Sequence, residues 1–210
     1  VELCEGLEQI ESDAFRGCLS LERLKVPSTV KVIREGAFRH CQLLVEVELC
    51  EGLEKIEKEA FYYCKLLEHM KIPSSVKIIG EDAFDECNGL LNVKLCEGLE
   101  VIEKGAFGRC KYLRRIKVPS TVKMIDEHAF YECEKLAEVE LCEGLEQVGR
   151  CAFTGCKSLM RIKVPSSVKV IFPLAFKWCS QLVEVELCEG LERIGCDAFL
   201  ECKSLKSMKI

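Results

Sequence analysis

Residues 67–87 of the chain read LEHMKIPSSVKIIGEDAFDEC, and this stretch contains every element of the fold. Apolar and polar residues alternate over residues 70–72, which is typical of a β-strand with one buried face. Pro73 and the two serines after it predict a turn, and residues 76–79 predict a second, shorter extended piece. The Ala-Phe-x-x-Cys segment at residues 83–87 predicts a tight turn, either 3₁₀ or a single helical turn, that closes the unit.

The same pattern returns every 23 residues along the chain, with no insertion or deletion. Nine Ala-Phe pairs mark the repeat, at Ala14-Phe15, Ala37-Phe38, Ala60-Phe61, Ala83-Phe84, Ala106-Phe107, Ala129-Phe130, Ala152-Phe153, Ala175-Phe176 and Ala198-Phe199. The third residue after each phenylalanine is always cysteine: Cys18, Cys41, Cys64, Cys87, Cys110, Cys133, Cys156, Cys179 and Cys202. A fixed period of this length predicts a solenoid, because one unit cannot bury its apolar face without a neighbour.

We therefore predict one solenoid domain over residues 1–210, with nine 23-residue units and a class that is α/β but mostly β. The first extended pieces should stack as a parallel sheet on the concave face, with strands ~4.7–4.9 Å apart. The short second strands and the 3₁₀ or helical turns should lie on the convex side. The chain starts and stops inside a sheet strand without a polar capping unit, so we expect a fragment of a longer array.

The pattern of residues 67–87, repeated in register along the chain, resembles the BspA-like (Treponema-type) leucine-rich repeats. The resemblance implies a leucine-rich-repeat solenoid used for recognition, as in surface adhesins and protein-binding scaffolds, and it carries over no catalytic residue. One departure is the segment Leu-Cys-Glu-Gly-Leu-Glu, which replaces Ile-Pro-x-Ser-Val in every other unit. The true period of the sequence is therefore 46 residues, or two units.

The chain has 16 cysteines, which raises the question of disulfides and metal sites. The nine at one register should form a column in the core, each as a small buried hydrophobe with a weak S–H donor. Disulfide pairing fits poorly because nine is odd and every member has the same neighbours. Zinc also fits poorly because the chain has no C-x₂-C pair. We predict free structural thiols.

Acidic and basic residues alternate along the stack, with one interruption. A position of the second extended piece alternates throughout: Glu8, Lys31, Glu54, Lys77, Glu100, Lys123, Glu146, Lys169 and Glu192. The outward residue of the first strand alternates less strictly: Glu2, Lys25, Glu48, Lys71, Lys94, Lys117, Glu140, Lys163, Glu186 and Lys209. Lys94 stands where alternation requires Glu, and two residues earlier Asn92 stands where it requires an acid.

Both interruptions fall in one central unit, so we predict a basic patch across three strands of the concave sheet: His69, Lys71, Asn92, Lys94, Arg114, Arg115 and Lys117. Such a patch suits a carboxylate, a phosphate or the acidic loop of a partner protein. The alternative is neutral drift on a tolerant surface.

A second irregularity predicts an apolar patch on the convex side. Phe172, Pro173 and Leu174 stand where other units have polar or small residues, and Trp178, the only tryptophan, follows closely. Clustered exposed apolar residues are typical of a partner contact. The alternative is an ordinary scatter of surface apolar residues.

The sequence lacks the motifs that are typical of the common enzyme classes. The chain has no G-x-G-x-x-G, Walker, H-E-x-x-H or G-x-S-x-G motif, and its three histidines occupy three different registers. We therefore predict no enzyme and no cofactor. The net charge of −5 argues against nucleic acid, and no apolar run is long enough to insert into a membrane.

Two function classes lead: a protein-binding or adhesin-type module that uses the concave sheet, and a purely structural spacer or engineered consensus array without a specific ligand. A receptor for carbohydrate or a small anion ranks lower, because the concave face carries no stacking aromatic residue. Head-to-tail self-association through uncapped ends is a linked expectation. The resemblance implies a surface or secreted protein, whereas unpaired cysteines and the absence of N-x-[ST] sequons favour a reducing compartment.

Overall fold

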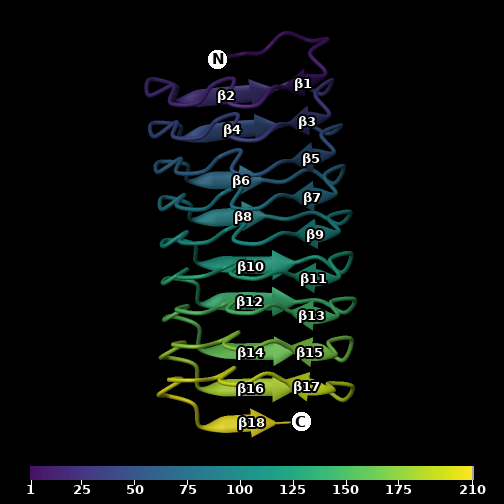
Figure 1. The fold of residues 1–210 in the computed structure, drawn as a ribbon, viewed down its shortest axis with the longest axis vertical. Helices are drawn as coiled ribbons and strands as arrows, with labels where there is room; N and C mark the ends of the chain where they lie inside the picture. The colour runs from purple at the N-terminus through teal and green to yellow at the C-terminus, as the bar shows by residue number, and fades with distance from the viewer. Residues whose placement is uncertain (210) are drawn as a thin grey trace.

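The computed structural model describes residues 1–209 and shows eighteen short strands wound into a coil. Each turn of the coil contributes one long strand and one short strand, and the two kinds form separate columns along the stack (Figure 1). Paired residues on neighbouring strands are 23 apart, as in Arg23 and Glu46 or Ile10 and Ile33. The solenoid and its 23-residue unit are confirmed.

The short strands have two residues each and form one continuous parallel sheet, here called the short-strand sheet. Its nine members are β1 (Gln9–Ile10), β3 (Val32–Ile33), β5 (Lys55–Ile56), β7 (Ile78–Ile79), β9 (Val101–Ile102), β11 (Met124–Ile125), β13 (Gln147–Val148), β15 (Val170–Ile171) and β17 (Arg193–Ile194). The second residue of each strand points into the core and is buried, except in β17 at the end of the stack.

The long strands form the face on which the basic patch is predicted, here called the long-strand face. They are β2 (Arg23–Val26), β4 (Glu46–Leu49), β6 (His69–Lys71), β8 (Asn92–Lys94), β10 (Arg115–Val118), β12 (Glu138–Leu141), β14 (Arg161–Val164), β16 (Glu184–Leu187) and β18 (Ser207–Lys209). They alternate exposed and buried residues, because the polar members face solvent and the apolar members enter the core.

The strands of this face are parallel, as predicted, and their pairing is interrupted once. The long strands form a six-stranded sheet from β2 to β12 and a three-stranded sheet from β14 to β18. Val139 in β12 is only partly buried, whereas its counterparts Ile116 and Ile162 are buried, so packing is looser at the break. β12 and β14 remain neighbours because the short-strand sheet and the core continue past them.

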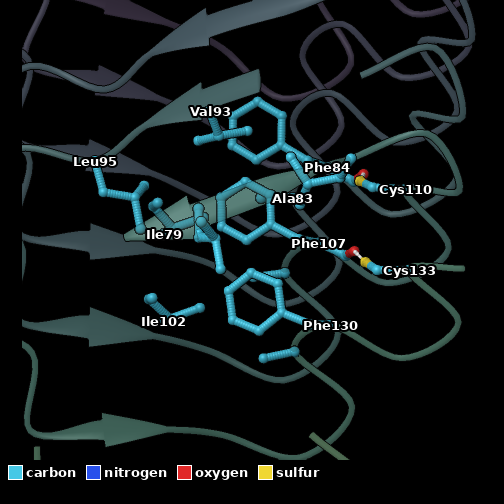
Figure 2. Packing of buried hydrophobic residues seen from close by; sticks show 14 of the residues in the cluster. Ile79, Ala83, Phe84, Val93, Leu95, Ile102, Phe107, Cys110, Phe130 and Cys133 are labelled. Atoms are coloured by element: carbon cyan, nitrogen blue, oxygen red, sulfur yellow. Dashed lines mark hydrogen bonds between the residues drawn. The ribbon is translucent and has the colours of Figure 1, made fainter. Parts of the chain in front are cut away.

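A column of stacked phenylalanine rings runs through the core (Figure 2). Neighbouring rings from Phe15 to Phe199 lie nearly parallel, with centroids 5.2 to 5.5 Å apart. The seven phenylalanines between the two ends are fully buried. Burial of a large side chain contributes about 1.5–3 kcal/mol before entropy is subtracted, so this column is a major source of cohesion between units.

The cysteine column lies beside the phenylalanines, and each thiol donates a hydrogen bond to the unit before it. Figure 2 shows two of these bonds: the Sγ of Cys110 lies 3.2 Å from the carbonyl oxygen of Phe84, and Cys133 contacts Phe107 at the same distance. The contact recurs from Cys41 to Cys202. The same carbonyl also accepts the amide of the cysteine in its own unit, as Phe84 does from Cys87, so the thiol is a second donor that links one unit to the next.

The Ala-Phe turns form a third ladder of hydrogen bonds between units. The amide of each phenylalanine donates to the carbonyl of the next unit's alanine at 2.8 Å, as from Phe84 to Ala106. Other amides of the turn bond three residues back within their own unit, as from Cys87 to Phe84 at 3.2 Å. This is 3₁₀-type bonding in single turns, and the described residues contain no helix able to cross a membrane.

The 46-residue period has a structural cause at the turns that follow the long strands. Glu51 in one unit accepts hydrogen bonds from the amides of Ser74 and Ser75 in the next, at 3.2 Å each. The amide of Gly52 in turn donates to the hydroxyl of Ser75 at 3.0 Å. Gly52 has φ +109, and a Cβ there would lie 2.4 Å from the carbonyl oxygen of Ser28. The Cys-Glu-Gly turn of one unit and the Pro-Ser-Ser turn of the next are therefore joined by hydrogen bonds as a pair.

Candidate functional site

The structure places six residues of the predicted basic patch on the long-strand face. His69 pairs with Asn92 and Lys71 pairs with Lys94 across β6 and β8. Asn92 also pairs with Arg115 in β10, which carries Lys117 further along the strand. We use the term basic patch for these six: His69, Lys71, Asn92, Lys94, Arg115 and Lys117.

Arg114, the seventh predicted member, precedes β10 and is not brought into the basic patch. It is exposed, but the hollow that contains the other six is lined by Arg115 and Ile116 rather than by Arg114. The main chain explains its position, because the Arg114 amide bonds to Leu91 and its carbonyl accepts from Ala137 just before the strands begin. Arg114 therefore borders the patch.

The basic patch occupies a hollow of about 1410 Å³ over the long-strand face, which extends from Glu46 to Arg161. Glu46 and Glu48 line it on one side of the patch, and Glu138 and Glu140 line it on the other. A ligand lying along the stack would thus meet acidic residues, then basic residues, then acidic residues again.

Ion pairs follow the alternation on either side of the patch. Lys25 reaches Glu48 at 3.4 Å, Lys117 reaches Glu140 at 2.5 Å and Lys163 reaches Glu186 at 2.6 Å. Lys71, Lys94 and Arg115 form no ion pair within residues 1–209. The hydrogen bond from Lys117 to Glu140 raises the pKa of that lysine. Three of the four lysine and arginine side chains in the patch therefore remain available to an anion.

Strand pairing is also reduced on either side of the two strands at the centre of the patch, β6 and β8. β4 pairs with β6 at one position, Glu46 with His69, and β8 pairs with β10 at one position, Asn92 with Arg115. β2 and β4 pair at four positions, as do β10 and β12. Like charges on adjacent strands are destabilising, but Lys71 and Lys94 lie on β6 and β8, which still pair at three positions, so like charge alone does not account for the reduced pairing on either side.

The predicted convex patch is less exposed than the sequence suggests. Phe172, Pro173 and Leu174 are only partly exposed, and Arg193 covers the Phe172 ring with its guanidinium 5.4 Å from the centroid. Trp178 is exposed, with the Lys177 ammonium 4.1 Å from its ring centroid. Cationic groups thus already occupy one face of both rings, and the apolar area on offer is small.

All 16 cysteines are free thiols, as predicted. Within residues 1–209 no group of three His, Cys, Asp or Glu side chains is arranged to hold a metal ion. Burial raises the pKa of the Cys41 thiol to about 11, and it also raises the pKa of Cys133 well above the usual thiol value. Cys41 and Cys133 are thus protonated and unreactive at neutral pH, which suits a structural role.

One polar site was missed from the sequence. On the turn side, a cavity of about 220 Å³ is lined by residues of three consecutive units: Asp82, Asp85, Lys104, Gly105, Gly108, Arg109, His128 and Tyr131. The available signal was the pair of glycines in one unit, at positions that carry side chains in the units on either side. The two glycines do not predict a cavity by themselves, because a cavity depends on the residues that the neighbouring units place around them.

Parallel strands in register, the leucine-patterned long strand and a ligand-sized hollow over one face together define a leucine-rich-repeat solenoid. The sequence matches the BspA type Leucine rich repeat region over residues 8–123 and 100–210, in six copies. The chain belongs to this family, which confirms the predicted resemblance. Leucine-rich-repeat proteins are generally non-catalytic.

Solved structures agree with this assignment. A leucine-rich repeat protein from Bacteroides ovatus has a TM-score of 0.75 and 28% identity, with 96% of this chain and 58% of that chain covered. The Treponema pallidum leucine-rich repeat protein has a TM-score of 0.70 and 35% identity, with 76% and 77% covered. The pneumococcal vaccine antigen PcpA has a TM-score of 0.62 and 28% identity, with 96% and 53% covered.

This chain thus spans little more than half the length of the Bacteroides ovatus and pneumococcal proteins. No curated protein matches the sequence.

Proposed function

We propose that this chain is a non-catalytic module that binds a protein through its long-strand face, with the basic patch contacting acidic side chains of the partner. One observation carries the proposal: Lys71, Lys94 and Lys117 succeed one another without an intervening acid, in a column where all other neighbours alternate in charge. An anionic ligand would remove the repulsion within this column and would pair with Lys71 and Lys94.

The hollow supports a macromolecular ligand. Its length spans six strands, from β4 to β14, and acidic residues flank the basic ones. A small anion would use only the centre of this surface, whereas a protein segment with a complementary charge order would use all of it. One similar structure is that of a vaccine antigen, which is consistent with an adhesin-type use of the fold.

Affinity capture from a source-cell lysate and surface fraction tests the proposal, with the wild-type chain compared with Asn92→Glu/Lys94→Glu. This double change restores the alternating charges and leaves the buried residues untouched. We expect at least one protein to bind the wild type and not the variant. Ser207→Glu/Lys209→Glu is the matched control, because it makes the same charge change at the same two positions outside the hollow.

If the Asn92→Glu/Lys94→Glu variant captures the same proteins as the wild type, the basic patch is not the binding site. If neither captures a protein, the structural spacer becomes the better description of this chain.

A further inference from the structure

The cavity on the turn side is a slot with a floor of glycine. The residue before the alanine and the residue after the phenylalanine of each Ala-Phe turn vary along the chain, and only the fifth unit has glycine at both, as Gly105 and Gly108. Both glycines are buried beneath side chains of the neighbouring units. The missing side chains leave the space of about 220 Å³ between the fourth and sixth units.

The two walls of the slot differ in chemistry. The fourth unit supplies Asp82 and Asp85, whose carboxylates lean over the floor: a Cβ on Gly105 would lie 1.9 Å from Asp82 Oδ1, and one on Gly108 would lie 2.8 Å from Asp85 Oδ1. The sixth unit supplies His128 and Tyr131, whose rings meet edge to face with centroids 5.3 Å apart. An acidic wall therefore stands opposite an aromatic wall.

Only one of the two carboxylates has a cationic partner. Asp85 is buried and is paired with Arg109, whose Nε donates to Asp85 Oδ1 at 3.1 Å. Asp82 is partly buried and has neither an ion pair nor a side-chain hydrogen bond within residues 1–209. Burial and the neighbouring Asp85 raise the pKa of Asp82.

The first unit offers an internal comparison. Asp13 occupies the same register as Asp82 and also leans over a glycine, Gly36. Asp13 has a partner, because Arg16 three residues later reaches it at 3.6 Å. In the fourth unit the residue three positions later is Asp85, so Asp82 meets a second acid where Asp13 meets a base.

We propose that this slot binds a small organic cation, an alkylammonium or guanidinium group, between the Asp82 carboxylate and the rings of Tyr131 and His128. A partly buried carboxylate pairs with the positive charge, and the face of an aromatic ring attracts it further. An inorganic divalent cation lacks a ligand set, since the described residues contain no suitable group of three.

Lys104 lines the slot, is exposed and forms no ion pair with any described residue. Arg109, the other cationic residue that lines the slot, is paired with Asp85, so Lys104 is the lining cation left to compete with a ligand for the slot.

Titration with n-butylammonium chloride and n-propylguanidinium chloride, followed by the NMR signals of Tyr131 and His128, tests the slot. We expect saturable binding that Asp82→Asn weakens at least about tenfold. Asparagine preserves the left-handed backbone at φ 52, so the turn should survive. Tyr131→Leu should also weaken binding, and Leu200 shows that leucine is accepted at this register.

Two further variants separate the site from general charge effects. Lys104→Ala should strengthen binding by removing the internal competitor, and it alters only an exposed side chain. Asp13→Asn should leave binding unchanged, because its carboxylate is already paired and does not line the slot. No saturable binding, equal affinity in Asp82→Asn, or calcium chloride binding that displaces n-butylammonium would overturn the proposal.

Capped lysine and arginine tripeptides identify the source of the cation. Affinity equal to that of the free amines supports a site for a side chain of a partner protein. Binding of the free amines alone supports a small-molecule site. Neither outcome depends on the basic patch, so failure of the slot and failure of the proposed protein-binding face are distinguishable.

Discussion

Lys71 and Lys94 lie directly opposite each other on the adjacent strands β6 and β8. Further along the same sheet, Lys117 meets Glu140 across β10 and β12, in the pairing of opposite charges that the rest of the face follows. Cross-strand pairs of like charge oppose sheet formation. Repulsion between these lysines therefore destabilises the centre of the long-strand face, and a bound anionic partner would remove that repulsion.

Lys94→Glu should stabilise the fold while it abolishes binding of an acidic partner. The change converts two repulsive neighbours, Lys71 and Lys117, into attractive ones, and we expect the Tm to rise by about 1–3 °C. Thermal unfolding followed by circular dichroism measures this. The opposite control is Lys25→Glu, which puts an acid beside Glu2 and Glu48 and should lower the Tm. A lower Tm for Lys94→Glu would show that charge order does not govern stability here.

Cys133→Ala should destabilise the chain by about 1–3 kcal/mol, because it leaves a cavity and removes one of the two donors to the Phe107 carbonyl. Cys133→Ser keeps a donor and should lose less. Cys142→Ala, at a partly exposed cysteine that directly follows β12 and lies outside the cysteine column, should change the free energy of unfolding by less than about 0.5 kcal/mol. Urea unfolding measures all three, and equal losses at Cys133 and Cys142 would contradict the structural role of the S–H donor.

Alkaline pH should destabilise the folded chain, because the buried thiols of the cysteine column resist losing their protons. Burial raises the pKa of Cys41 from 9.0 to about 11, and it also raises the pKa of Cys133 well above 9.0. A raised pKa in the folded state means that the unfolded chain loses these protons first as pH rises. The stabilisation is complete below about pH 9 and is lost progressively above it.

We therefore expect the free energy of unfolding, measured in urea from pH 7 to 10.5, to fall increasingly steeply above pH 9. Cys133→Ala should reduce that slope by at most about 1.4 kcal/mol per pH unit, the contribution of one proton. A flat profile to pH 10.5 would show that the thiols remain as accessible in the folded chain as in the unfolded one.

The left-handed backbone conformation of residues in the Ala-Phe turns should have a measurable cost in the free energy of unfolding. Gly17 has φ 69, and a Cβ added there would meet no atom within 4 Å, so Gly17→Ala isolates the backbone cost. We expect a loss of about 1 kcal/mol. Glu201 occupies the same register with φ 61, and Glu201→Gly should stabilise by about 0.5–1 kcal/mol. Changes of the same sign in both variants would contradict this reading of the turn.

Head-to-tail association of the 210-residue chain should appear at high concentration. Leu19 is 56% exposed beside a hollow of about 730 Å³ at the first unit, and Ile194 and Met208 are exposed at the last. Leu19→Lys should shift light scattering towards the monomer. Leu66→Lys, at a leucine exposed in mid-stack, is the control. A monomer at every concentration would argue against stacking.

The sequence alone determined the layers of this protein. A 23-residue period places equivalent residues one strand spacing apart, so the phenylalanine and cysteine columns, the parallel register and the charge alternation follow from counting residues. Once the register is known, the neighbours of Lys94 are known as well, and the basic patch could be predicted except for the position of Arg114. The family resemblance rested on the same regularity.

Only the tertiary structure decided what depends on backbone conformation and local packing. The hydrogen-bond ladder of the Ala-Phe turns needs left-handed residues such as Glu59 and Asp82, which local preference does not favour. The break between β12 and β14 reflects looser packing at one layer, which a pattern of residue types does not reveal.

The slot above Gly105 and Gly108 exists because three units, each ordinary by itself, bring an acidic wall, an empty floor and an aromatic wall together. A repeat pattern predicts what the units share. The space left by their differences depends on the contacts made when they stack.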